Sequence, residues 1–79
     1  MKLTLHHLDN GTFAAEIPTE SGEKEIVFSS SYDTNAERVD HYSVLSRILR
    51  ASWGIILPPI SETGLTEPGE ETVSVKVAS

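Results

Sequence analysis

The stretch that decides the fold is residues 3–17, which read Leu-Thr-Leu-His-His-Leu-Asp-Asn-Gly-Thr-Phe-Ala-Ala-Glu-Ile. Asp9-Asn10-Gly11 lies between two runs in which apolar and polar residues alternate, a pattern typical of a β-hairpin. A two-residue turn would place Leu5 on the same face as Glu16 and split the apolar set. A three-residue loop with a left-handed glycine gathers the apolar side chains on one face, so we predict that register. The expected pairs are Leu3 with Ile17, Leu5 with Ala15, and His7 with Phe13.

A third strand and a helix are predicted to follow the hairpin. Residues 25–29 have strand chemistry, with Ile26 and Phe28 on one face. Thr34-Asn35-Ala36-Glu37 matches a capping box, which predicts a helix from about Asn35 to Trp53 with Gly54 as its C-cap. One side of that helix carries an apolar stripe at spacings of three and four residues, formed by Val39, Tyr42, Leu45, Ile48, Leu49 and Trp53. The opposite side carries Asp40, Ser43, Arg47 and Arg50.

The remainder of the chain predicts a short apolar segment, a loop and a last strand. Residues 55–60 contain two prolines, so we expect an extended segment over the core and no central strand. Residues 61–71 are polar and without period, as in a loop. Residues 72–78 alternate, with Val73, Val75 and Val77 on one face. The prediction is an α+β fold of order β-β-β-α-β, a three-stranded antiparallel meander covered by one amphipathic helix, with a fourth strand at the C-terminal end.

Length and composition indicate one domain spanning residues 1–79, with a thin hydrophobic core. The chain has no cysteine, which favours a reducing compartment, and residues 1–7 are too polar for a signal peptide. No stretch approaches the roughly 20 apolar residues of a membrane span, so we expect no contact with a membrane. These observations together predict a cytoplasmic protein.

The net charge of −6 disfavours direct contact with nucleic acid, whose phosphates would be repelled. The charge is uneven along the chain: residues 1–32 and 54–79 each carry −3, whereas residues 33–53 are neutral and hold all three arginines. The two acidic flanks are therefore the segments that we expect to meet a protein partner with a basic surface.

No catalytic, cofactor or metal site is predicted. His6 and His7 are adjacent in a strand and point to opposite faces, so they do not chelate one ion together, and His41 would need a carboxylate brought to it by the fold. The serines occur outside nucleophile-elbow patterns, and the glycines are scattered singly at turns. We therefore expect no enzymatic activity and no cofactor.

The favoured function is binding to a larger protein. In size, acidity and lack of cysteine the chain resembles phage-encoded inhibitors, anti-CRISPR proteins among them, and this resemblance implies that it blocks a basic nucleic-acid-binding surface. The residues expected to make the contact are Glu20, Glu23, Glu25, Glu62, Glu67, Glu70 and Glu71. The alternative is a structural subunit, for example a homodimer, that assembles through a sheet edge, with residues 72–78 as the edge strand and Lys76 as a modest guard against pairing.

Overall fold

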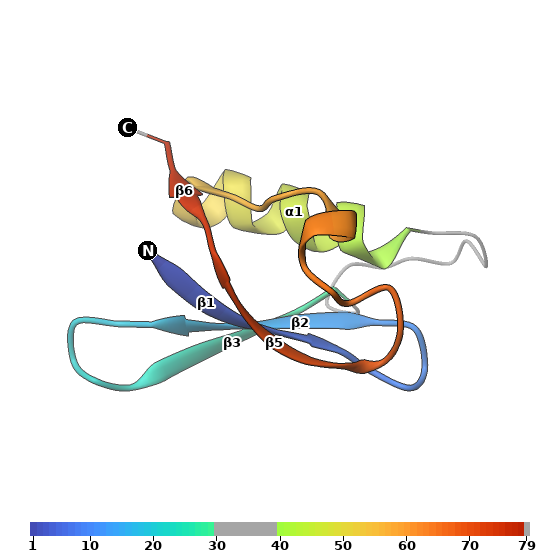
Figure 1. The fold of residues 1–79 in the computed structure, drawn as a ribbon. Helices are drawn as coiled ribbons and strands as arrows, with labels where there is room; N and C mark the ends of the chain where they lie inside the picture. Colours follow the sequence, from blue (N-terminus) through green and yellow to red (C-terminus); the bar gives the residue numbers. More distant parts are fainter. Residues whose placement is uncertain (30–39, 79) are drawn as a thin grey trace.

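The computed structural model describes residues 1–29 and 40–78, which form a sheet with one helix packed across it (Figure 1). Its elements are β1 (Lys2–His7), β2 (Phe13–Pro18), β3 (Lys24–Phe28), α1 (His41–Trp53), β4 (Ile55–Ile56), the 3-10 helix η2 (Ile60–Glu62), β5 (Gly69–Ser74) and β6 (Lys76–Val77). The main sheet is antiparallel and has the order β3-β2-β1-β5, and β4 pairs with β6 in a second, two-stranded sheet. The predicted α+β class, with a meander and one covering helix, is confirmed.

The predicted register of the first hairpin is confirmed. Leu5 lies opposite Ala15 and His7 opposite Phe13. Gly11 has a φ of 87°, and its N–H donates to the carbonyl of Leu8 at 3.0 Å, as the three-residue loop requires. The hairpin therefore turns its apolar side chains to the face that α1 covers.

The core lies between that face and α1. Its buried members are Leu3, Leu5, Phe13, Ala15, Ile17, Val27, Tyr42, Leu45, Leu49, Ile55, Leu65, Val73 and Val75, and Ile48 and Trp53 pack against them half-buried. The helical stripe from Tyr42 to Trp53 thus faces the sheet as predicted, whereas its predicted first member, Val39, lies outside the described residues. Leu65 was not expected in the core, because it comes from the segment predicted to be a polar loop.

Strand β3 turns a different side to the core from the one its composition suggests. Ile26 and Phe28 do share a face, but it is the open face of the sheet, where they are 52% and 41% exposed. Val27 lies opposite Ala15 and is buried instead. The pairing partner on β2 decides which side faces inward. We expected the large apolar residues of this thin fold to be buried in the core, and for Ile26 and Phe28 that expectation is wrong.

Helix α1 begins later than predicted. Asp40 has an extended backbone, with φ −75° and ψ 97°, and its side chain accepts from the N–H groups of Tyr42 and Ser43. A continuous helix from Asn35 to Trp53 is therefore wrong, since Asp40 is the N-cap; the capping box at 34–37 lies outside the described residues. The predicted C-cap is confirmed, with Gly54 at φ 67° and its N–H bonded to the carbonyl of Arg50.

The predicted last strand, residues 72–78, is divided in two. Strand β5 begins at Gly69 and pairs with β1, so the end of the predicted loop is also strand. At Val75 the chain leaves the main sheet, and β6 pairs with β4. Val77 was predicted to share a face with Val73 and Val75. Those two are buried, whereas Val77 is 53% exposed. Among the described residues, no helix has both the length and the apolar character needed to cross a bilayer.

Candidate functional site

The face of the sheet opposite α1 is uncovered by the described residues, and the strand register arranges its side chains in rows. One row runs across the four strands as Glu70, His6, Ala14 and Phe28. The next row runs as Thr72, Thr4, Glu16 and Ile26. The imidazole of His6 and the carboxylates of Glu70 and Glu16 therefore lie on β1, β5 and β2 of this open face, and apolar side chains lie on β3.

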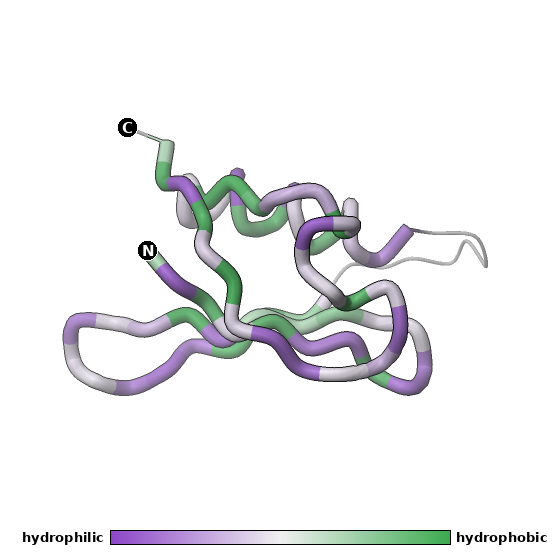
Figure 2. The backbone as a smooth tube through the Cα atoms, viewed as in Figure 1, coloured by the Kyte–Doolittle hydropathy of each residue, from purple (hydrophilic) through white to green (hydrophobic). Residues whose placement is uncertain are grey.

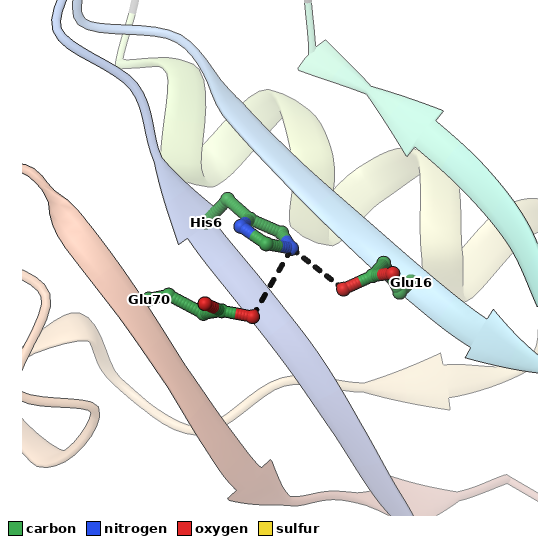
Figure 3. A group of neighbouring side chains, drawn as sticks. All are labelled: His6, Glu16 and Glu70. Atoms are coloured by element: carbon green, nitrogen blue, oxygen red, sulfur yellow. Dashed lines mark hydrogen bonds and ion pairs between the residues drawn. The ribbon is translucent and has the colours of Figure 1, made fainter.

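His6, Glu16 and Glu70 converge on the open face from three neighbouring strands (Figure 3). The His6 Nε2–H donates to Glu16 Oε2 at 2.7 Å, and Glu70 Oε1 lies 3.9 Å from the same nitrogen. The side chains of His6 and Glu16 are 27% and 22% exposed, whereas that of Glu70 is 63% exposed. One ligand atom from each residue lies within 4.8 Å of the other two.

The register explains this convergence. Glu70 is directly opposite His6 across the β1–β5 pair. On β2, Ala14 is directly opposite His6, and Glu16, two residues further along, is the diagonal neighbour of His6. Both arrangements bring side chains of one face within contact distance. His6 and Glu16 share a face in the predicted hairpin register, so that part could have been found from the sequence. Glu70 could not, because residues 61–71 were expected to form a loop, whereas Glu70 lies in β5.

The electrostatic setting of Glu16 favours its ionised form. The hydrogen bond from His6 is the largest cause that lowers the pKa of Glu16 below its ordinary value of 4.5, and the charge of Lys24 adds to it. Partial desolvation opposes these effects without outweighing them. Glu16 is therefore a carboxylate that can bind a cation or accept a hydrogen bond.

An open groove of about 360 Å³ adjoins this cluster at the end of the sheet. It lies where the β1–β2 turn meets the start of β5, and its walls are His6, His7, Leu8, Asp9, Pro68, Gly69 and Glu70. We call the group Asp9, Glu67, Glu70 and Glu71 the acidic end; Glu16 pairs with Thr4 in the middle of the sheet. Lys2 and Lys24 lie at the other end of the sheet, because they pair with Ser74 and Pro18.

The structure separates the residues predicted to bind a partner into three places. Glu67, Glu70 and Glu71 belong to the acidic end. Glu20, Glu23 and Glu25 lie at the opposite end of the sheet, in the β2–β3 turn and the start of β3. Figure 2 shows both places as hydrophilic stretches of the chain. All of these side chains are exposed, but the register does not bring the two groups together.

Glu62 lies apart from both groups. It is in η2, on the helix side of the molecule, and lines a groove of about 280 Å³ with Lys76 and Pro58. Burial, and more weakly the charge of Glu62, raise the pKa of Tyr42 to about 12, and the Tyr42 hydroxyl donates to the carbonyl of Pro58. Glu62 therefore does not extend the acidic end.

The other two histidines serve packing. The His7 ring stacks on Phe13 at 4.2 Å between centroids, and its Nδ1–H donates to the carbonyl of Leu65 at 2.9 Å. His41 Nδ1 lies 3.0 Å from Ser29 Oγ, which also accepts from the N–H of Phe13. The Ser29 side chain is fully buried, so a substrate has no path to its hydroxyl in this conformation. This pair joins β2 to the start of α1.

The open face therefore offers one imidazole, several carboxylates and two exposed apolar side chains. Carboxylates bind the guanidinium and ammonium groups of a basic protein surface, and with an imidazole they also bind divalent metal ions. No family model, curated protein or solved structure matches this chain.

Proposed function

We propose that this protein is a non-enzymatic binder that docks on a basic surface of a larger protein through the open face of its sheet. The observation that carries the proposal is that the carboxylates of Glu16 and Glu70 lie in the same two rows of the open face as the exposed Ile26 and Phe28, with Glu16 directly opposite Ile26. Protein interfaces combine such apolar contacts with a polar rim. The acidic end supplies the charge, and β3 supplies the apolar area.

The excess negative charge gives this face a way of reaching its partner quickly. With a net charge of −6, the chain is attracted over long range to a positive surface, and screening by salt weakens the attraction. Arginine side chains of the partner would donate paired hydrogen bonds to Glu67 or Glu70. Of the seven glutamates predicted from the sequence, these two are the ones that the proposal retains at the interface, because Glu71 pairs with Leu5 and lies on the other side of β5.

A basic surface on a partner protein is frequently a surface that holds nucleic acid. An acidic face seated there would exclude phosphate backbones, so the proposed effect is inhibition, in the manner of the phage-encoded anti-CRISPR inhibitors that the chain resembles in size and acidity. The chain itself would not contact nucleic acid. We propose the cytoplasm as its compartment, because a chain without cysteine draws no stability from an oxidising one.

Capture from a host lysate tests the proposal. The untagged chain, coupled to beads, is compared with two matched double reversals: Glu67→Lys with Glu70→Lys at the acidic end, and Glu20→Lys with Glu23→Lys at the opposite end. We expect the wild type and the second variant to retain the same partner, identified by mass spectrometry, and the first variant to lose it. The captured partner should elute as salt rises, and it should fail to bind its nucleic acid when saturated with the chain.

Two controls make the result decisive. All buffers contain EDTA, so that bound metal plays no part, and circular dichroism verifies that each variant is folded. Equal capture by the wild type and both variants would show that charge at the acidic end is not used. Loss only with the Glu20→Lys and Glu23→Lys variant would move the interface to the β2–β3 end.

The exposed edge of β3 favours a second candidate, assembly of copies through a sheet edge. Strand β3 is an edge of the main sheet, and both of its large exposed side chains lie beside that edge. The predicted edge, residues 72–78, is an edge of the main sheet only as far as Ser74, where β5 ends, because β6 pairs with β4. Light scattering at high micromolar concentration tests this candidate. A wild-type dimer that becomes monomeric in the Ile26→Lys variant would support it, and a monomeric wild type would rule it out.

A further inference from the structure

We infer that His6, Glu16 and Glu70 form a binding site for a single zinc ion on the open face of the sheet. The three side chains come from β1, β2 and β5, and their ligand atoms lie within 4.8 Å of one another. One imidazole nitrogen and two carboxylate oxygens are ligands that zinc accepts in proteins. This inference does not rest on the proposed partner, because the geometry would hold whatever the face binds.

The distances are close to those of a coordinated ion. Zinc lies about 2.0–2.1 Å from nitrogen and oxygen ligands, so tetrahedral ligands are roughly 3.3 Å apart. The Nε2 of His6 is 2.7 Å from Glu16 Oε2 and 3.9 Å from Glu70 Oε1, values on either side of that spacing. Small side-chain movements therefore suffice. Glu70 is the most exposed of the three and has the most freedom to make them.

Binding the ion requires a defined rearrangement of protons. In the described state the Nε2 of His6 carries the proton that it donates to Glu16. The ion takes the place of this proton: neutral His6 changes tautomer, so that its proton sits on Nδ1 and the Nε2 lone pair binds zinc.

The surroundings leave the site open for an additional ligand. The groove of about 360 Å³ reaches His6 and Glu70, so water can complete a four-coordinate shell. Among the described residues, the carboxylates of Glu16 and Glu70 have ion pairs only with His6. The other two imidazoles bond to Leu65 and Ser29. Magnesium and calcium prefer more oxygen ligands than this site supplies, which favours zinc.

Isothermal titration calorimetry with zinc chloride tests the site on the untagged 79-residue chain at neutral pH. We expect one ion per chain for the wild type. Glu16→Gln and Glu70→Gln should each weaken zinc binding by about tenfold or more, since even residues behind the ligands cost that much in metal sites. Glu71→Gln is the matched control, because Glu71 neighbours Glu70 on the opposite side of β5, and its affinity should equal the wild-type value.

Nitrogen NMR of the imidazoles locates the ion. Zinc should shift Nε2 of His6 and leave the nitrogens of His7 and His41 unmoved, and magnesium should shift none of them. Equal weakening by Glu70→Gln and Glu71→Gln would show diffuse attraction by charge and would overturn the inference. So would a zinc shift at His41, or no heat in the wild-type titration. A third variant, His6→Ala, should lose zinc binding. If this variant does not fold, the two glutamine variants decide the outcome.

Discussion

Glu16 couples the stability of the protein to pH through its bond to His6. Because its pKa is lowered in the folded state, the carboxylate stabilises the fold above about pH 4.5, and this contribution is lost as pH falls through the lower folded value. His6 and Lys24 face it from the two neighbouring strands, β1 and β3, and Glu70 faces it from β5, on the far side of β1. We predict that Glu16→Gln removes part of the acid sensitivity, measured as urea unfolding from about pH 6 to about pH 3.

The matched control for that experiment is Glu20→Gln, which removes a glutamate from the exposed β2–β3 turn. Its unfolding curves should follow the wild type across the same range. If Glu16→Gln also follows the wild type, the bond between His6 and Glu16 adds nothing to stability.

Ser29 satisfies a buried backbone donor, which gives a second prediction at this scale. Its Oγ accepts from the Phe13 N–H at 3.0 Å in a fully buried position. We expect Ser29→Ala to lower the free energy of unfolding by about 1–3 kcal/mol, because that N–H loses its partner. Chemical denaturation measures the loss, and Ser52→Ala, at an exposed position of α1, should change stability by less than about 0.5 kcal/mol.

Among the elements, α1 depends on the single side chain that caps it. Asp40 accepts from two backbone N–H groups and from the hydroxyl of Ser43. We predict that Asp40→Ala costs about 0.5–2 kcal/mol, whereas Asp40→Asn keeps most of the stability because asparagine also caps well. Thermal unfolding followed by helical circular dichroism measures both. Equal losses for alanine and asparagine would show that the cap bonds are unimportant.

The segment between η2 and β5 depends on Leu65. This side chain is 1% exposed in a stretch that is otherwise polar, and His7 bonds to its carbonyl. We predict a loss of about 2–3 kcal/mol in urea unfolding for Leu65→Ala, near the low end for buried leucines because a loop can settle into the space. Leu57→Ala, at a half-buried site, should cost less. A larger loss of stability for Leu57→Ala than for Leu65→Ala would show that Leu65 contributes less to the core than Leu57 does.

The elements that could be predicted were those whose signals are local. The hairpin register followed from the three-residue loop Asp9-Asn10-Gly11 and the alternation beside it, and the C-cap followed from Gly54. The side of β3 that faces the core could not be predicted in this way. Ile26 and Phe28 make one side more apolar than the side of Val27, but the pairing with β2 turns Val27 inward. The cluster of His6, Glu16 and Glu70 also escaped prediction, because Glu70 reaches it by a pairing between distant parts of the chain.

For the whole molecule, the sheet combines short-range and long-range pairings. Strands β1, β2 and β3 pair with their neighbours in sequence, whereas Lys2 pairs with Ser74. Because distant contacts cost more closure entropy, we expect β5 to join late in folding. Val73→Ala, which removes about 1.5 kcal/mol of burial, should speed unfolding by about tenfold and leave the folding rate nearly unchanged.

Ile17→Val in β2 is the comparison, because its contacts belong to the locally paired part of the sheet. Stopped-flow kinetics should show that it slows folding more than Val73→Ala does. If Val73→Ala slows folding as much as Ile17→Val, then β5 docks before the rate-limiting step.

The pairing of Lys2 with Ser74 also has a consequence for synthesis in the cell. A ribosome releases β1 well before β5, the strand that covers its outer side, because residues 8–68 are made between the two. Until then the nascent chain carries an unsatisfied strand border, which invites misassembly between growing chains. The β1–β2 hairpin can form on the ribosome, and the finished sheet must wait until Ser74 has cleared the exit tunnel.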